Sequence, residues 1–348
     1  MITKRIPAEW EKHSATLISL PHNKEDWPGK FHPIPWVYVE IIKKLTSGEK
    51  VFVVVKGKQN EYRFKKMLSK SGVNLTRVKF LIFPTNRSWM RDTAPFFVKE
   101  DLGEGELVSA VKFKFNAWAK YSNWKKDERI PELLTSRLQV KISKAIYQSK
   151  EVVLEGGAID KNGWGTLLTT EECLMDQNVQ VRNPGYSKKD YEEVFQQFCG
   201  IKKIIWLKKG IIGDDTHGHV DDVARFVSRN SIVLCKETNS KDENYKLLEE
   251  NKEIIEGEVN EAGEKLQIIS LPMPEPIIFE GMRLPASYAN FYIGNNVVLV
   301  PTFNDRNDRI AIGILAELFP NREVVGIHAV DLIWGLGTIH CLSHEIPE

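Results

Sequence analysis

The sequence predicts an α/β protein, because amphipathic helical segments alternate along the chain with short runs of β-branched and other apolar residues. Each helical segment leads directly into such a run. The helix and strand ranges, in chain order, are 37–45 with 51–55, 60–69 with 78–83, 188–198 with 203–207, 242–259 with 266–270, and 308–318 with 323–327. A doubly wound sheet alternates in the same way, but the chain has neither G-x-G-x-x-G nor a P-loop to support it.

Candidate catalytic residues follow several of these helix and strand pairs. Asp92, His219 and Cys341 each come nine to fourteen residues after the end of a predicted strand. A repeated module arranged around an axis would bring such loops into one pocket. Pro and Gly are spread through the chain without an obvious linker, so we expect a single domain over residues 1–348.

The charge balance argues against several classes of partner. Lys and Arg number 48 and Asp and Glu number 47, which leaves a formal net charge of +1. No overall field therefore favours nucleic acid or an anionic membrane. Apolar runs stay well short of the roughly 20 residues that span a bilayer, and the N-terminal residues do not form a signal peptide. We expect a cytoplasmic protein with no nucleic-acid or membrane partner.

The cysteines do not form a recognisable framework. Their spacing lacks C-x-x-C and supports neither a disulfide set nor a zinc site. For Cys173, Cys199 and Cys235 the favoured interpretation is a small buried hydrophobic side chain. Cys341 differs, because it follows a glycine-containing turn and a histidine and precedes the polar run 343–345. It is the candidate nucleophile.

A cluster of His and Asp residues lies at 214–222 and allows two interpretations. Its residue types could hold a metal ion. In an extended segment alternate residues share one face, so His217, His219 and Asp221 would point the same way and could equally pair an acid-base histidine with a substrate-binding carboxylate. No third ligand with metal spacing is evident elsewhere, and we expect neither a metal nor a cofactor.

Two further carboxylates are candidates. Asp92 follows Arg91, which would fit a surface ion pair, yet apolar residues including Trp89 surround it. A carboxylate in such a wall needs a positive partner, and a substrate guanidinium could supply it, with Trp89 stacked on the cation. Glu155 follows an apolar run and precedes two glycines, so it is either a turn residue or the group that fixes the His219 tautomer.

Taken together, the motifs resemble the agmatine deiminase family, within the guanidine-modifying enzymes that include the peptidylarginine and arginine deiminases. The resemblance extends over nearly the whole chain. Its motifs are Pro7-Ala-Glu-Trp10, Trp89-x-Arg-Asp-Thr-x-Pro95, Phe115-Asn-Ala-Trp118, Leu154-Glu-Gly-Gly157, Gly165-Thr-Leu-Leu-Thr-Thr-Glu-Glu-Cys173, Asp215-Thr-His-Gly-His-Val-Asp221, Leu284-Pro-Ala-Ser-Tyr288, Asn290-Phe-Tyr292, Val300-Pro-Thr-Phe303 and Ile339-His-Cys341.

The resemblance implies a fold and a reaction. The fold is a five-bladed α/β propeller (pentein) with pseudo-fivefold repeats. The reaction is hydrolysis of agmatine to N-carbamoylputrescine and ammonia through a covalent thiouronium intermediate. The implied roles are nucleophile for Cys341, general acid and base for His219, grip on the guanidinium for Asp92 and Asp221, and orientation of His219 for Glu155.

The substrate remains open among several guanidines, and the sequence departs from the family pattern at two places. Asp215 is the candidate acceptor for the distal amine of agmatine, and arginine, peptidylarginine or another guanidine remain alternative substrates. A catalytically silent guanidinium-binding protein is a further alternative, and a homodimer is a modest expectation. Gly335-Leu336-Gly337-Thr338 replaces a glycine-richer turn, so Leu336 would be strained if it needs positive φ. The run 342–345 also departs from the family pattern after the cysteine.

Overall fold

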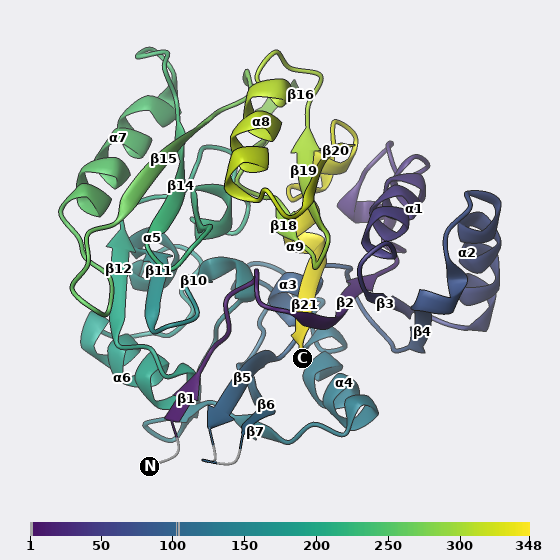
Figure 1. Cartoon of the computed structure of the whole chain (residues 1–348), viewed down its shortest axis with the longest axis horizontal. Helices are drawn as coiled ribbons and strands as arrows, with labels where there is room; N and C mark the ends of the chain where they lie inside the picture. Colours follow the sequence, from purple (N-terminus) through teal and green to yellow (C-terminus); the bar gives the residue numbers. More distant parts are fainter. Residues whose placement is uncertain (1–2, 102, 104) are drawn as a thin grey trace. The chain divides into compact units, whose positions relative to one another are not determined.

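The computed structural model describes residues 3–101, 103 and 105–348 and divides into two compact units. Unit 1 comprises Met1–Glu9 and Asp92–Leu271, and unit 2 comprises Trp10–Arg91 and Pro272–Glu348. The chain crosses between the units inside the short helix α3 (Met90–Thr93). Both units combine helices with small sheets, as Figure 1 shows, which confirms the α/β class.

Unit 1 holds three sheets of three or four strands and a two-stranded hairpin among its described residues. The strand orders are β1-β5-β6-β7, β10-β11-β12, β13-β14-β15 and β8-β9. The strands are β1 (Thr3–Arg5), β5 (Phe96–Asp101), β6 (Glu106–Lys112), β7 (Ile142–Lys144), β8 (Ile146–Tyr147), β9 (Lys150–Glu151), β10 (Asp160–Lys161), β11 (Thr166–Thr170), β12 (Lys203–Leu207), β13 (Ala224–Phe226), β14 (Ser231–Lys236) and β15 (Gln267–Pro272). Its helices are α4 (Ile130–Leu138), α5 (Glu171–Met175), α6 (Lys188–Cys199) and α7 (Glu243–Glu256).

Unit 2 holds two larger sheets and a hairpin. The strand orders are β21-β2-β3-β4, β18-β19-β20 and β16-β17. The strands are β2 (His13–Ser19), β3 (Lys50–Val55), β4 (Val78–Ile82), β16 (Ile278–Phe279), β17 (Met282–Arg283), β18 (Tyr292–Ile293), β19 (Val297–Thr302), β20 (Glu323–His328) and β21 (Ser343–Pro347). Its helices are α1 (Ile34–Leu45), α2 (Lys58–Lys70), α8 (Asp308–Leu318) and α9 (Ile339–Leu342).

The same order of elements recurs in both units. An antiparallel strand pair is followed by a helix and then by a strand that joins the pair in parallel, as in β10-β11 with β12 and in β18-β19 with β20. Parallel strands need such a crossover, and a helix is its usual form. Each repeat therefore places the loop that follows its last strand at a comparable position.

Helix α6 illustrates why these segments become helices. Ser187 and Asp190 form a capping box at its start, and Gly200 takes the left-handed conformation at its end. Tyr191, Phe195 and Phe198 are buried on one face, at the spacing of an amphipathic helix. This face packs into the core of unit 1, which also contains residues of β5, β6 and β11.

The helices and strands of all five predicted pairs are present, with ends that shift by a few residues. The pair α4 and β7 was not predicted. Helix α4 is short, and β7 is a three-residue strand with little burial, so neither leaves a strong periodic signal in the sequence.

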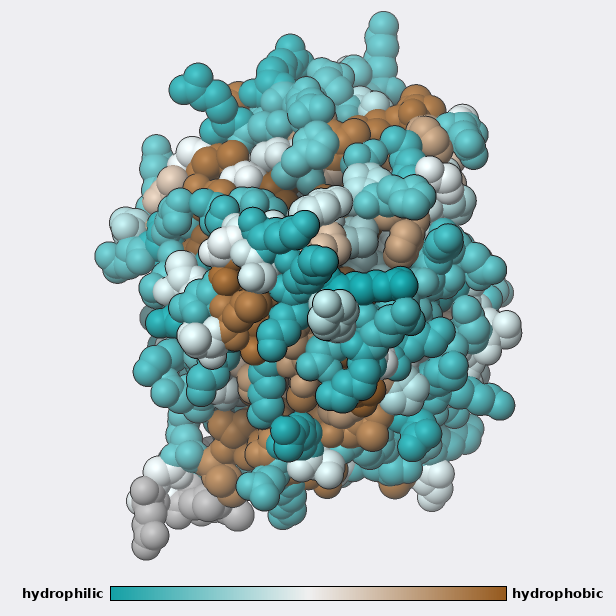
Figure 2. Space-filling model, turned by 90° about the vertical axis from the view of Figure 1, so that its right-hand side faces the viewer, coloured by the Kyte–Doolittle hydropathy of each residue, from teal (hydrophilic) through white to brown (hydrophobic). Residues whose placement is uncertain are grey.

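Hydrophilic residues dominate the face drawn in Figure 2, and hydrophobic residues gather between them in smaller groups. Within the described residues, helices that combine the length and apolar character needed to cross a membrane are absent.

Candidate active site

Four of the predicted site residues come together around Gly157 in unit 1. Gly157 lies in the 3-10 helix η4 (Gly156–Ala158), directly after Glu155. A methyl group on Gly157 would lie 2.5 Å from His219 Nδ1 and 3.1 Å from both Asp92 Oδ1 and Asp221 Oδ2. These distances show how tightly the two carboxylates and the imidazole surround this glycine.

Asp92 is buried and held by two donors. The Trp118 indole N–H donates to its Oδ2 at 2.9 Å, and the Gly157 backbone N–H donates to its Oδ1 at 3.0 Å. Burial raises the pKa of Asp92 to about 6, and the negative charges of Asp221 and Glu155 act in the same direction against the opposing effect of His219. Arg91, its neighbour in the chain, pairs with Glu345 at 2.7 Å.

Glu155 is fully buried and ionised. Arg182 Nε donates to its Oε1 at 3.1 Å. Burial alone would raise the pKa of Glu155, but the charges of Arg182 and His219 outweigh it and hold the pKa at about 2. The backbone carbonyls of Gln180 and Thr216 accept from the same guanidinium, so Arg182 is fixed in place.

His219 lies between acidic groups just before the 3-10 helix η5 (Val220–Asp222). Its Nδ1 is 4.0 Å from Asp92 Oδ1, and its Nε2 is 3.9 Å from Glu155 Oε2. Burial alone would lower the pKa of His219. The Asp92 carboxylate, with Cys173 and Glu155 acting in the same direction, instead raises this pKa well above its ordinary value. The imidazolium form of His219 is therefore favoured.

The expected shared face of His217, His219 and Asp221 is wrong for His217, whereas His219 and Asp221 meet around Gly157. The segment is not an extended strand: His217 has a φ of 66°, and Val220 to Asp222 form the helix η5. His217 Nε2 instead lies 2.8 Å from Asp176 Oδ2. Alternation of residue types in the sequence cannot reveal a positive φ such as that of His217.

Asp215 lies in the same unit with partners of its own. Lys120 Nζ approaches its Oδ1 at 2.5 Å, and the Tyr121 hydroxyl donates to its Oδ2 at 2.7 Å. Lys120 and Tyr121 follow a run of three residues with positive φ, from Ala117 to Ala119, which includes the Trp118 that binds Asp92. One loop therefore connects the Asp92 and Asp215 positions.

Unit 2 carries Cys341 in helix α9. Asn290 Nδ2 donates to the Cys341 sulfur at 3.1 Å. The Asn290 Oδ1 accepts from the Thr338 hydroxyl at 2.7 Å and from the His340 backbone N–H at 3.0 Å. These two donors fix the orientation of the amide, because a flipped amide would turn its NH₂ group toward them. The donor side of Asn290 is thus directed at the sulfur.

The turn before Cys341 packs against two tryptophans. A methyl group on Gly337 would lie 2.9 Å from the Trp89 ring and 3.2 Å from the Cys341 sulfur. Trp89 is buried and its ring lies 5.5 Å from that of Trp27. Leu336 has a φ of 67°. Its backbone is therefore in the left-handed region, where a residue other than glycine is strained.

The departure at 342–345 forms a buried contact. Glu345 accepts from Arg91 at 2.7 Å, and Arg91 Nε donates to the His340 carbonyl at 3.3 Å. Glu345 therefore fixes the strand that follows the nucleophile to the segment that precedes Asp92.

Of the predicted residues, Asp92, Glu155, His219 and Asp221 form one cluster in unit 1, and Trp89 and Cys341 lie close to Gly337 in unit 2. The sequence did not reveal three residues that orient them: Gly157, Arg182 and Asn290. Asn290 lies in a motif that was noted, but its partner is 51 residues away in the chain. No spacing rule connects two such positions.

The chain matches known proteins over almost its full length. The family model of the Porphyromonas-type peptidyl-arginine deiminases matches residues 5–347. A protein of Mycoplasma capricolum, provisionally named as an agmatine deiminase, is 33% identical over 98% of this chain and 95% of its own.

Two solved structures are similar to this one. An agmatine deiminase of Enterococcus faecalis, described as catalysing its reaction, has a TM-score of 0.89 and 27% identity, covering 99% of this chain and 96% of its own. A substrate-bound agmatine deiminase of C. jejuni with a cysteine-to-serine substitution has a TM-score of 0.87 and 31% identity, covering 100% and 97%. The chain is therefore a member of the peptidyl-arginine deiminase class defined by this family model. More particularly, it belongs to the agmatine deiminase family.

Proposed function

We propose that this protein hydrolyses agmatine to N-carbamoylputrescine and ammonia, with Cys341 as the nucleophile. The observation that carries the proposal is the buried cluster of Asp92, Asp221, Glu155 and His219 around Gly157. Buried carboxylates need positive partners, and a planar guanidinium with paired N–H donors matches them. The names of the relatives, whose similarity extends over nearly the whole chain, support the same substrate.

Asp92 and Asp221 bind the guanidinium in this proposal. Burial raises the pKa of Asp92 to about 6, and the negative charge of Asp221 acts in the same direction. A bound cation would relieve the repulsion between the two carboxylates and keep both ionised. Substrate binding would thus add positive charge to a cluster that contains three carboxylates.

Cys341 and His219 carry the chemistry. The thiolate attacks the guanidinium carbon and forms a C–S bond. The His219 imidazolium gives its proton to the departing nitrogen, ammonia leaves, and a thiouronium remains on the sulfur. Neutral His219 then takes a proton from water, whose oxygen attacks the same carbon. The C–S bond breaks and the new hydroxyl group loses its proton to solvent, which releases the neutral ureido product and the Cys341 thiolate.

Glu155 and Trp89 support these steps. The carboxylate of Glu155 is held ionised by Arg182, so it can stabilise the imidazolium form of His219 that the first step needs. Trp89 packs against the turn that carries Cys341 and presents a ring that could stack on the substrate cation.

Asp215 binds the distal amine of agmatine in this proposal, in competition with Lys120. Lys120→Gln should lower KM for agmatine by about 2- to 5-fold, because a partly exposed ion pair is worth about 0.2–1 kcal/mol. The Lys120 side chain is 40% exposed, which fits that range. An alkylguanidine of the same length without the amine should show no change. Lys125→Gln removes one positive charge five residues further along the chain and serves as the control. An equal fall in KM in this control would contradict the role of Asp215.

The finer architecture and setting are proposals as well. Within the described residues, five sheets of three or four strands support a five-bladed propeller with pseudo-fivefold repeats, folded as a single domain. A cytoplasmic homodimer that uses no metal or cofactor for its chemistry and has no nucleic-acid or membrane partner completes the proposal. Light scattering of the purified chain would test the dimer.

A trapped intermediate would test the mechanism. We expect mass spectrometry of the intact chain, acid-quenched during its first turnovers of agmatine, to find a thiouronium adduct on the peptide that contains Cys341, and His219→Ala to carry less of it, since that variant lacks the acid that expels ammonia. The Cys341→Ala protein should carry no adduct, and Cys199→Ala should behave as the unmodified chain. An adduct on another cysteine, or product formation by Cys341→Ala, would overturn the proposal.

A further inference from the structure

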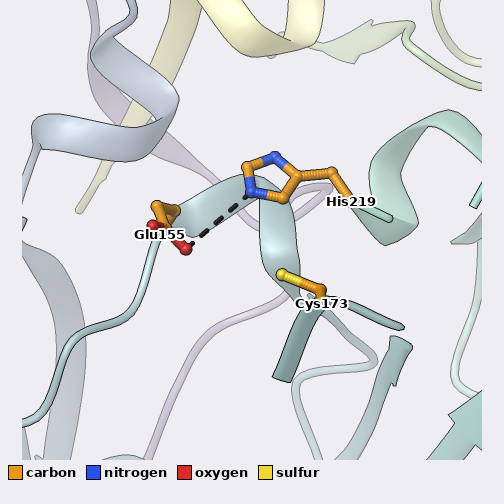
Figure 3. Close-up of side chains that lie close together, drawn as sticks. All are labelled: Glu155, Cys173 and His219. Atoms are coloured by element: carbon orange, nitrogen blue, oxygen red, sulfur yellow. Dashed lines mark ion pairs between the residues drawn. The ribbon is translucent and has the colours of Figure 1, made fainter. Parts of the chain in front are cut away.

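Three side chains of unit 1 that can bind metal ions meet beside the proposed acid-base histidine. Glu155 precedes η4, Cys173 lies in α5, and His219 precedes η5, so three separate segments contribute. One ligand atom from each lies within 4.8 Å of the other two, and all three residues are buried. Figure 3 shows the Cys173 sulfur and the Glu155 carboxylate directed toward the His219 ring.

Two of these ligand atoms have no hydrogen-bond partner within the part of the chain that the structure describes. They are Glu155 Oε2 and His219 Nε2. Their separation of 3.9 Å is too long for a charge-assisted hydrogen bond, which spans about 2.7–2.9 Å. Buried polar atoms in native proteins are almost always paired, so these atoms indicate room for a further partner. Glu155 Oε1 is already occupied by Arg182, which leaves Oε2 directed at the site.

The ligand types select the kind of partner. A thiolate, an imidazole and a carboxylate together suit Zn²⁺, whereas Mg²⁺ and Ca²⁺ require oxygen ligands. Zinc bonds of about 2.0–2.3 Å place the ligands of a tetrahedral ion about 3.3–3.8 Å apart. The nitrogen and oxygen atoms are already 3.9 Å apart, so small side-chain rotations would complete the arrangement.

The surrounding charges also favour a divalent cation. Asp92 and Asp221 lie close to His219 around Gly157 and add negative charge to the cluster. Arg182 opposes a cation, but it is a single positive group beside several acidic ones. A cation at the centre would reduce the repulsion from Asp221 and Glu155, which adds to the effect of burial on the pKa of Asp92.

We propose that Glu155, Cys173 and His219 form a zinc site that inhibits the enzyme by occupying the imidazole needed for proton transfer. Zinc would bind the Cys173 thiolate and neutral His219, so protons are released on binding and affinity rises with pH. A water molecule can fill the fourth position. Binding depends only on these ligands, whereas inhibition rests on the function proposed above for His219.

The test measures zinc binding separately from turnover. It uses Cys341→Ser, which removes the proposed nucleophile as a competing zinc ligand, and titrates Zn²⁺ against a chromogenic chelator. We expect one zinc per chain. Adding Cys173→Ser should weaken binding by at least about 100-fold, because even groups that only support a ligand affect zinc affinity by about 10- to 100-fold. Adding Cys199→Ser is the matched control, since burial raises the pKa of this thiol in the same unit to about 12.

A second variant and a spectroscopic measurement distinguish loss of the zinc site from misfolding of the protein. Adding His219→Ala in place of Cys173→Ser should also remove the site, and thermal unfolding would establish that each variant is folded. Co²⁺ bound to Cys341→Ser should show thiolate charge-transfer absorption that Cys173→Ser abolishes. Zinc affinity unchanged by Cys173→Ser, or no zinc binding by Cys341→Ser, would overturn the proposal even if the deiminase mechanism is correct.

With Cys341 intact, inhibition adds an independent readout. Zinc should inhibit the deiminase reaction and a chelator should restore it, while Cys173→Ser should need at least about 100-fold more zinc relative to its own zinc-free rate. Equal sensitivity of both proteins would show that inhibition, if it occurs, uses other groups.

Discussion

Gly157 shows how one missing side chain shapes the cluster in unit 1. Its Cβ position lies 2.5 Å from His219 Nδ1, so Gly157→Ala must displace the imidazole or the loop. We expect kcat/KM for agmatine to fall by about 100-fold or more, since misplacement by about 1 Å can have that effect. The φ of Gly157 is not in the left-handed region, so the backbone accepts alanine. Steady-state kinetics with a thermal unfolding scan would check this. Gly257→Ala, where a methyl group meets only ordinary contacts, should leave kinetics unchanged.

We expect Asn290 to stabilise the thiolate form of Cys341. Its donor lies 3.1 Å from Cys341 Sγ, and a hydrogen bond to a charged group contributes about 1.5–3 kcal/mol. Asn290→Ala should therefore shift the pH midpoint of Cys341 alkylation upward by about 1–2 units and lower kcat by about 10- to 100-fold at neutral pH.

Asn290→Asp tests the same role with a charged side chain. It keeps the shape of the side chain but places a carboxylate beside the sulfur, so alkylation should shift further upward than in Asn290→Ala. Asn260→Ala, a buried asparagine bonded to Asn230 and Glu264, is the control and should leave alkylation unaltered. A midpoint that stays constant in both Asn290 variants would contradict a thiolate-stabilising role.

At the scale of elements, the turn between β20 and α9 carries backbone strain. Leu336 has left-handed φ and ψ of 67° and 23°, which cost a non-glycine residue about 1–2 kcal/mol. Leu336→Gly should raise the free energy of unfolding by about 0.5–1 kcal/mol, after the greater entropy of glycine in the unfolded chain is counted. Chemical denaturation would measure this. Leu318→Gly, in the last turn of α8, should instead destabilise by about 1 kcal/mol; stabilisation by both would contradict the assignment to backbone strain.

The longer helices and strands could be predicted because their buried residues recur in the sequence with the period of a helix or form a continuous apolar run. The buried face of α6 repeats at helical spacing, and β3 is a continuous apolar run, so both appear in the sequence. Short elements such as α4 and β7 carry too few residues to establish a period. The segment at 214–222 was misread because its shape depends on the positive φ of His217 and on η5, which pattern alone does not encode.

At the scale of the whole molecule, the site residues could be identified from the sequence and its motifs, whereas their environment is visible only in the structure. Cys341, His219, Asp92, Asp221 and Glu155 were each named from the sequence. The short distance between Cys173 and His219 could not be predicted from the sequence, because α5 and η5 meet only after folding. The buried pair of Arg182 and Glu155 was missed for the same reason.

Because Asp92 is buried, we expect the affinity for agmatine to fall at acidic pH. The pKa of Asp92 is raised to about 6, so the carboxylate gains a proton as the pH falls through that value and loses its attraction for a guanidinium. Calorimetry with Cys341→Ser and agmatine should find constant affinity above pH 7 and a fall of up to about tenfold per pH unit below 6. Glu155, with a pKa of about 2, should stay ionised throughout. Affinity that rises as the pH falls from 7 to 5 would show that Asp92 does not bind the cation.

The most direct test of the central claim measures ammonia and ureido product from agmatine, arginine and a blocked arginine peptide, with the intact chain and with Cys341→Ala. We expect the intact chain to act on agmatine, with much lower kcat/KM for the other two, and Cys341→Ala to lose at least about 10⁴-fold in kcat. Preferential action on the peptide or on arginine would retain the cysteine mechanism and contradict the agmatine assignment. Turnover of agmatine by Cys341→Ala at the rate of the intact chain would contradict the cysteine mechanism itself.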